Sequence, residues 1–147
     1  MSRNSSILER GEVKFQKAVK DAVIAHMGAL AEKSIVRALV FYRKWEHRTM
    51  NLMDAYGYAI YYNGNLVRKK MAPPKAIGPD TEGGMGADRG SDFIDGYIPK
   101  FQGWCLVVVN GEFYAEFIDS LKGLDVLTGA FQYSVDNFTN IQFKKIQ

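Results

Sequence analysis

The sequence has few of the residues that most enzymes, metal sites and disulfide frameworks depend on. Its 147 residues include one cysteine, Cys105, and two histidines, His26 and His47. A single cysteine excludes an intrachain disulfide framework and a Cys-x-x-Cys metal site. Neither histidine has a possible metal ligand three or four residues further along the chain, which is the spacing that zinc sites on helices use. The sequence therefore predicts no metal and no cofactor.

Long apolar runs are missing as well. The longest, Trp104–Val109, has six residues, whereas a membrane-spanning helix needs about 20. The first residues do not show a basic segment followed by an apolar one, so we expect no secretory signal and no membrane partner. The 47% of hydrophobic residues suffices for a core, and the length is typical of a single domain covering residues 1–147.

Charge is distributed unevenly along the chain. Residues 1–71 contain thirteen Lys and Arg and six Asp and Glu, a net charge of +7, whereas residues 72–100 and 101–147 each carry a net charge of −2. This asymmetry is compatible with three interpretations. It can mark a nucleic-acid surface, it can serve head-to-tail contact between the basic and acidic parts of neighbouring subunits, or it can reflect a solvated, lysine-rich helix face.

A long helix is expected between residues 7 and 45, after a polar segment, 1–6, that we expect to be frayed. The segment has no proline, and Val19, Val23, Met27 and Leu30 recur at helical spacing. Gly28 leaves open whether this is one rod or two helices, because glycine is unfavourable inside a helix. Such a helix needs a sheet or a neighbouring subunit to cover its apolar stripe.

A β-hairpin follows. Residues 56–62 and 65–71 are rich in aromatic and β-branched residues and flank Asn63-Gly64, a pair that favours the type I′ turn. Alternation places Tyr56, Tyr58, Ile60 and Tyr62 on one face of the first strand.

The segment 72–100 is predicted to be an extended loop. It contains all four prolines of the chain, and residues 78–90 include five glycines. We expect this loop to be mobile in the free subunit and ordered in an assembly. Its glycines do not match a phosphate-binding loop, since no Gly-Lys-Ser/Thr follows them.

A buried strand is predicted at 103–110, followed by a second turn at Asn110-Gly111. Residues 113–121 fit either a strand or a helix. A final helix with Asp125 as its cap carries a stripe formed by Leu127, Phe131, Ser134, Val135, Phe138 and Ile141, and ends near Lys144 and Lys145. The order predicts an α+β fold in which the long N-terminal helix and the C-terminal helix pack on a small, mostly antiparallel sheet.

No arrangement of residues points to catalysis, so we expect that the protein is not an enzyme and assign no catalytic, cofactor-binding or metal-binding residues. Cys105 lies among apolar residues and is expected to be a core residue. His26 is expected to pack beside the helix stripe and His47 to be solvated. Five carboxylates of the long loop are expected to be solvated too, because mobile backbone positions a catalytic acid poorly. They are Asp80, Glu82, Asp88, Asp92 and Asp95.

A nucleic-acid-binding module is the alternative class. The basic first half and the hairpin tyrosines, which could stack on bases, favour it. However, the long helix must cover one strand face, so a core role for these tyrosines competes with base stacking.

Three segments together resemble a known family. Residues 48–55, with Thr49, Asn51 and Leu52, follow the long helix directly before the hairpin, a Gly/Pro-rich insertion comes next, and Tyr114 and Ala115 follow the later strand. This order is similar to that of the tail-completion, or head–tail joining, proteins of tailed bacteriophages. The chain departs from the family pattern at residues 116–119 and 125–126.

The resemblance implies a structural protein of the virion, made in the host cytoplasm. It implies a neck or tail-completion subunit that forms a homo-oligomeric ring and joins the portal region to the tail. The implied partners are copies of the chain itself and other neck, portal or tail proteins, with packaged DNA passing through the channel.

Overall fold

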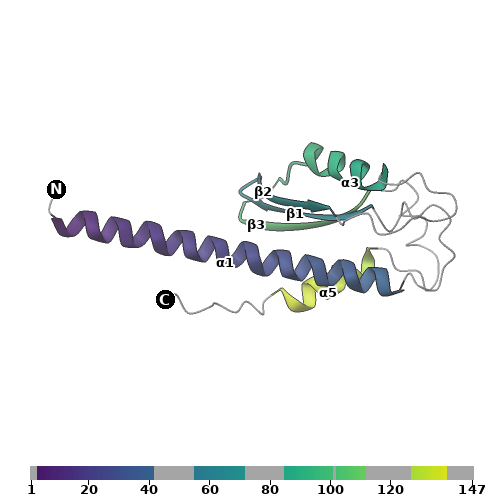
Figure 1. The fold of residues 1–147 in the computed structure, drawn as a ribbon, viewed down its shortest axis with the longest axis horizontal. Helices are drawn as coiled ribbons and strands as arrows, with labels where there is room; N and C mark the ends of the chain where they lie inside the picture. The colour runs from purple at the N-terminus through teal and green to yellow at the C-terminus, as the bar shows by residue number, and fades with distance from the viewer. Residues whose placement is uncertain (1–2, 42–54, 72–84, 101, 112–126, 139–147) are drawn as a thin grey trace.

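The computed structural model describes residues 3–41, 55–71, 85–100, 102–111 and 127–138. These residues form three layers (Figure 1). A three-stranded antiparallel sheet lies in the middle, helices α1 (Arg3–Phe41) and α5 (Thr128–Asn137) lie on one side of it, and helix α3 (Met85–Gly96) lies on the other. This arrangement confirms the α+β fold with two helices packed on a small antiparallel sheet.

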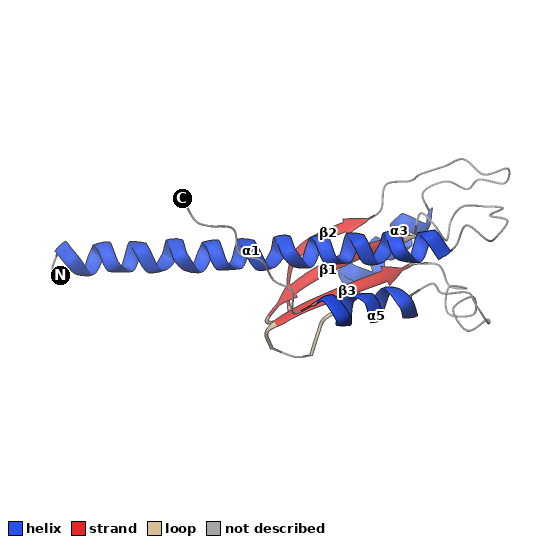
Figure 2. Cartoon of the chain, turned by 90° about the horizontal axis from the view of Figure 1, so that it is seen from below, coloured by secondary structure: helices blue, strands red, loops and turns tan. Residues whose placement is uncertain are grey.

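Helix α1 is one continuous helix of 39 residues. It begins at Arg3. Residues 3–6 therefore belong to the helix, and the expectation that they are frayed is wrong. Gly28 does not break it, because this glycine is buried under the sheet: an added Cβ would lie 3.1 Å from the Tyr58 hydroxyl and 3.3 Å from Nη1 of Arg68. The N-terminal part of α1 extends beyond the sheet (Figures 1 and 2).

The hairpin has the expected bounds. Strand β1 (Tyr56–Tyr62) pairs antiparallel with β2 (Asn65–Met71), with an irregularity between Ile60 and Tyr61. Asn63 and Gly64 connect the strands with φ values of 50° and 77°. Both values lie in the left-handed region that a type I′ turn requires.

Strand β3 (Trp104–Asn110) pairs antiparallel with the other side of β1, which gives the order β2-β1-β3. Gly103, with φ 95°, precedes it and joins it to the hairpin turn. The Gly103 amide donates to Oδ1 of Asn63 at 2.8 Å, and the Asn63 amide donates to the Gly103 carbonyl at 3.0 Å.

The sheet has an apolar core on each face. Towards α1 and α5, the buried residues Tyr56, Tyr58 and Ile60 pack with Met27 and Ala31. Towards α3, a smaller cluster forms, consisting of Ala59, Tyr61, Ile94 and Val109. The alternation predicted for β1 is therefore correct, and both of its faces are used.

The prediction that 72–100 is one extended loop is wrong for residues 85–96, which form α3. One glycine of this helix allows close packing where the sequence suggested mobility. Gly90 is buried, and an added Cβ would lie 2.6 Å from Cε of Met71 and 3.0 Å from the Ala55 carbonyl oxygen. Ile94, four residues later, packs on the sheet. The prediction for residues 72–84 lies outside the described residues.

The final helix is present, but it begins later than expected. It begins at Thr128 with Leu127 at the N-cap position, where no side chain caps it. Asp125 is therefore two residues too early to be the cap. The predicted end of the helix near Lys144 and the segment 113–121 lie outside the described residues.

Candidate interaction surfaces

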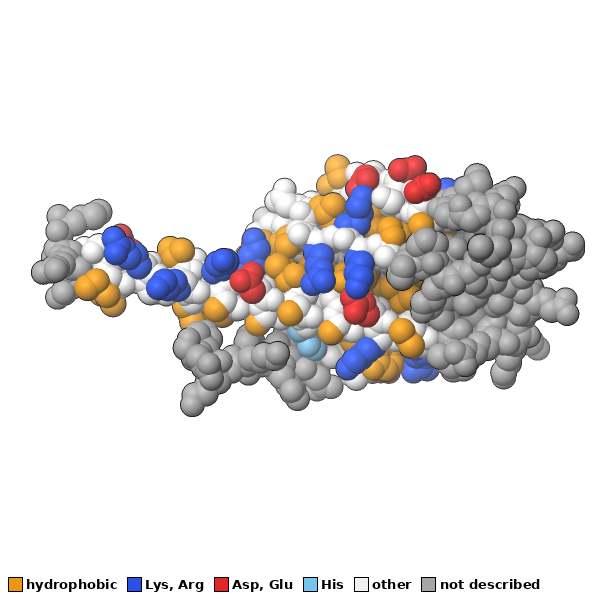
Figure 3. Space-filling model, in the orientation of Figure 1, with side chains coloured by type: hydrophobic (Ala, Val, Ile, Leu, Met, Phe, Trp, Pro, Cys, Tyr) orange, Lys and Arg blue, Asp and Glu red, His pale blue; other side chains and the backbone are white. Residues whose placement is uncertain are grey.

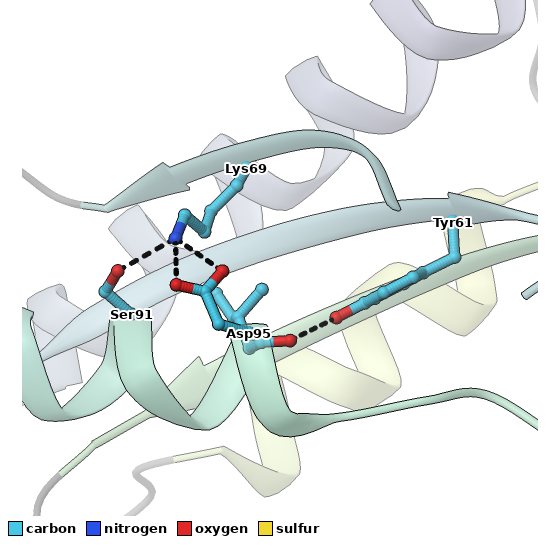
Figure 4. A network of polar contacts seen from close by, with 5 residues as sticks. Tyr61, Lys69, Ser91 and Asp95 are labelled. Carbon is cyan, nitrogen blue, oxygen red and sulfur yellow. Dashed lines mark hydrogen bonds and ion pairs between the residues drawn. The ribbon is translucent and has the colours of Figure 1, made fainter. Parts of the chain in front are cut away.

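A polar network attaches α3 to the sheet (Figure 4). Lys69 of β2 donates to both carboxylate oxygens of Asp95, at 2.7 and 2.8 Å, and to the Ser91 hydroxyl at 2.9 Å. On the buried side, the Tyr61 hydroxyl donates to the Ile94 carbonyl at 3.0 Å. Asp95 thus lies on a helix and not in a loop, and it is an ion-pair partner although its side chain stays 56% exposed. The network therefore holds α3 against the sheet, and each of its polar side chains takes part in one of these hydrogen bonds.

A second polar cluster links α1 to the hairpin. One carboxylate oxygen of Glu32 accepts a 2.6 Å bond from Lys70 and a 3.4 Å bond from the Tyr58 hydroxyl. The hydrogen bond from Lys70 lowers the pKa of Glu32, and the same bond raises the pKa of Lys70. Burial raises the pKa of Tyr58. All three changes favour the ion pair and the neutral phenol at neutral pH.

Exposed cationic side chains run along α1 and across β2 (Figure 3). Those of α1 include Lys14, Lys17, Lys20, Lys33 and Arg37, and those of β2 are Arg68, Lys69 and Lys70. Two of the β2 cations already hold carboxylates, since Lys69 pairs with Asp95 and Lys70 with Glu32. The strand therefore offers less free positive charge than its sequence suggests.

The hairpin tyrosines are mostly core residues. Tyr56, Tyr58 and Tyr61 have exposed fractions of 0%, 1% and 2%. Base stacking by these three tyrosines is excluded because their rings face helices. Tyr62 is the exposed member of the group, and it packs against Trp104 with a ring-centroid distance of 4.6 Å.

The projecting part of α1 carries an apolar stripe that touches no other described element closely. Every residue from 7 to 17 is exposed, and we call this segment the rod. Ile7, Leu8 and Phe15 are 62%, 73% and 62% exposed, and an added Cβ at Gly11 would meet nothing within 4 Å. At 3.6 residues per turn these four positions share one side of the helix, roughly opposite to the side that Met27 buries further along.

A second apolar surface lies between α5 and β3. A groove of about 600 Å³ is open there, and we call it the α5–β3 groove. Its strand wall is formed by Trp104, Cys105, Leu106 and Val108, and its helix wall by Leu127, Phe131, Ser134, Val135 and Phe138.

The helix wall of this groove is the stripe that the sequence predicted for the final helix. Phe131, Val135 and Phe138 remain 67%, 52% and 40% exposed. Helix α5 turns a different side towards α1: Ala130 is buried there, and the Ser134 hydroxyl lies 2.7 Å from that of Ser34. The sequence correctly showed the stripe but not that it would lie open.

The residues singled out for chemistry are dispersed over the fold. His26 is half-buried, with Nε2 3.2 Å from the Phe138 carbonyl oxygen, which agrees with the packing role expected for it. Cys105 is half-buried in β3, and desolvation raises the pKa of its thiol. Within the described ranges, no three His, Cys, Asp or Glu side chains come together as a metal site would require. No helix in these ranges is long and apolar enough to cross a membrane.

Several residues that the sequence singled out lie outside the described ranges. They include His47, Asp80 and Glu82, and all the residues that carry the family resemblance, namely Thr49, Asn51, Leu52, Tyr114 and Ala115. Comparison with family models, with curated proteins and with solved structures finds no match.

Proposed function

We propose that this chain is a non-catalytic assembly subunit, which works by binding other protein chains. The observation that carries the proposal is the presence of two separate apolar surfaces, the rod and the α5–β3 groove. Contiguous apolar surface of this kind marks interaction sites in proteins that stay in solution. Two different surfaces on one chain suit head-to-tail contacts, which form closed rings when the rotation between subunits closes.

Within that class, we propose a structural protein of the virion of a tailed bacteriophage. It would form a homo-oligomeric ring in the neck or at the end of the tail and join the portal region to the tail. The order of segments that resembles tail-completion proteins supports this assignment, as does the absence of a reacting cluster among the described residues. Its partners would be copies of itself and other neck, portal or tail proteins, with packaged DNA passing through the channel.

The test is mass measurement and negative-stain imaging of the purified protein, alone and with virion components. Rings, or incorporation into a neck or tail complex, are the expected result. A protein that stays monomeric under both conditions and never joins virion components would contradict the proposal.

A nucleic-acid-binding module is the second candidate, favoured by the exposed cations along α1 and β2 in Figure 3. A salt-titrated binding assay with duplex DNA separates the two. A dedicated binder with 6–10 phosphate contacts loses about 10³–10⁵ in affinity between 50 and 200 mM salt. A ring that lets DNA pass needs only loose contacts, so we expect weak binding at every salt concentration. Tight, salt-dependent binding by a stable monomer would favour the second candidate.

A further inference from the structure

We propose that a row of five exposed cations, which we call the basic row, contacts the phosphate backbone of duplex DNA. The row consists of Arg10, Lys14, Lys17 and Lys20 of α1 and Arg68 of β2. Figure 3 shows Lys and Arg side chains following one face of the molecule from the projecting part of α1 to the sheet. The proposal rests on the proposed function, in which packaged DNA passes through the ring, and it specifies the face of the subunit that lines the channel.

The helical period and the position of β2 bring these cations into line. At about 100° per residue, Arg10, Lys14 and Lys17 fall within about 60° of one another around α1. Arg68 lies further along the same side, because its Nη1 would be 3.3 Å from a Cβ added to Gly28. Gly28 follows Arg10 by 18 residues, which is five full turns and about 27 Å along the axis. The row is therefore straight and is held by one continuous helix.

The charge of the row is not neutralised by the described residues. None of the five cations forms an ion pair with another described residue. Lys20 lies over the ring of Tyr62, with Nζ 5.9 Å from the ring centroid, and keeps its charge. Asp21 is an exposed carboxylate beside the row, whereas Glu32 already pairs with Lys70. Five cations and one carboxylate leave a net charge of +4.

The other charged and apolar residues of the rod lie on other sides of α1. Glu9 and Glu12 are about 100° and 170° around the helix from the middle of the row, and Glu12 accepts a hydrogen bond from Gln16 at 3.1 Å. Leu8 and Phe15 of the apolar stripe are also more than about 120° away. The basic row is therefore a separate surface from the stripe of the rod.

A straight row of cations on a stiff support fits the regular charges of a nucleic-acid duplex. Duplex DNA carries one negative charge per about 1.7 Å of its axis, so about 16 phosphates lie along the 27 Å of the row. Five cations for so many phosphates give a sparse contact. Lysine and arginine at this spacing bind the backbone without selecting a sequence. Such a contact holds DNA in a channel and still lets it pass.

The acidic surface of another copy of the chain matches the row less well. Among the described residues, exposed carboxylates gather on α3, where Asp95 is already held by Lys69. This leaves Asp88 and Asp92, with Arg89 between them. Helix α3 has 12 residues, or about 18 Å. Two carboxylates on so short a helix would leave most of the row without a counter-charge, so the structure favours DNA.

The salt dependence of DNA binding tests the row. The row variant carries Lys14→Gln and Lys17→Gln, and the matched control carries Lys33→Gln and Arg37→Gln. The control positions are exposed and lie roughly on the opposite side of the same helix, so both variants lose two positive charges. Fluorescence anisotropy measures the affinity for a labelled duplex of about 20 base pairs, which is two helical turns, from low salt to about 200 mM.

The two variants should differ in the slope of log K against log salt concentration. Each lost phosphate contact makes this slope about 0.9 shallower, so we expect a change of about 1.8 in the row variant and almost none in the control. Equal slopes for the two variants would overturn the proposal. Absence of any DNA binding by the unaltered chain at low salt would overturn it as well.

Photocrosslinking provides a measurement that does not depend on affinity. The photoreactive residue p-benzoylphenylalanine replaces either Lys17 of the row or, as the control, Lys33. We expect irradiation in the presence of duplex DNA to link DNA to position 17 and much less to position 33. Equal yields at both positions would mean that DNA does not contact the chain through the row.

Anionic vesicles distinguish DNA from a membrane surface. Vesicles of phosphatidylglycerol and phosphatidylcholine are offered at the same phosphate concentration as the duplex. The unaltered chain should bind the duplex more tightly than the vesicles, and the row variant should lose affinity for the duplex. Tighter binding to the vesicles would show that the row contacts a membrane, and the proposal would fail.

Failure of the row and failure of the proposed function give different results. If the chain forms rings or joins virion components but the row variant keeps the slope of the unaltered chain, another face lines the channel and the basic row is wrong. If the row variant has the shallower slope but the unaltered chain stays monomeric and never joins virion components, the row is right and the virion assignment is wrong.

Discussion

The two ends of α1 carry similar apolar side chains in different surroundings. Around Met27 and Ala31 the helix lies on the sheet, and these residues are 1% and 0% exposed. Around Leu8 and Phe15 the same helix has no sheet beside it, and both side chains are more than 60% exposed. An apolar stripe in a sequence therefore shows that a helix needs a partner, but not whether that partner belongs to the same chain.

The largest expected difference between the two ends concerns deletion of a large side chain. Met27→Ala should lower the free energy of unfolding by about 2–5 kcal/mol, because it leaves a cavity in the core beneath the tyrosines. Phe15→Ala should change it by less than about 0.5 kcal/mol, as for an exposed site without special contacts. Urea unfolding of both variants at a concentration where the protein is monomeric measures this contrast. Equal losses would show that the rod is covered within the monomer.

The contact of α1 with α5 should depend on one buried serine. The Ser34 hydroxyl donates to the Leu30 carbonyl at 2.8 Å, so the bond shared with Ser134 is donated by Ser134. Ser34→Ala should lower the free energy of unfolding by about 1 kcal/mol, which is typical for the loss of one such bond. In a double-mutant cycle with Ser134→Ala, the second substitution should add little to the first. Full additivity would mean that the two hydroxyls do not interact.

The two glycines of α1 also differ in their surroundings, because Gly11 lies in the exposed part of the helix and Gly28 lies under the sheet. Gly11→Ala should raise the free energy of unfolding by about 0.5–1 kcal/mol, since alanine favours the helix and the new methyl group has open space. Gly28→Ala gains the same helix preference, but its methyl group meets the Tyr58 hydroxyl and the Arg68 guanidinium. Its effect should therefore be less favourable than that of Gly11→Ala. Thermal unfolding of the two variants side by side checks the order, and a reversed order would contradict it.

The smallest expected effect comes from Glu32 and depends on pH. Its folded-state pKa is lowered, first of all by the hydrogen bond from Lys70. The ionised form therefore stabilises the fold above the unfolded-state pKa, and this contribution is lost as the pH falls through the folded-state pKa. Glu32→Gln should be slightly less stable than the unaltered chain at pH 7 and equal to it at strongly acidic pH. In a Lys70→Gln background this pH dependence should weaken, and a difference that persists in acid would contradict the assignment.

Local chemistry explains which parts of the fold were predictable from sequence. The hairpin was predictable because Asn63-Gly64 and the alternating tyrosines specify turn and faces over a short stretch of chain. Helix α3 was missed because its glycines were interpreted as flexible, whereas Gly90 provides the room that Met71 and the Ala55 carbonyl need. That use of glycine depends on residues far away in the sequence.

The interaction surfaces were predictable only in part. The stripe of Phe131, Val135 and Phe138 could be recognised by its helical spacing. Its exposure depends on the position of α5 relative to β3, which local sequence does not determine. The long helix was expected to need a sheet or a neighbouring subunit, and the structure shows that the sheet covers only its C-terminal part.

The outer edge of β2 has a consequence for how the protein behaves when it is concentrated. This strand lies at the end of the sheet order and carries three consecutive cations, Arg68, Lys69 and Lys70. Charged side chains on an edge strand oppose the pairing of one sheet with another, which is the usual route to amyloid-like aggregation. These three cations therefore oppose edge-to-edge pairing between copies of this sheet in a concentrated solution.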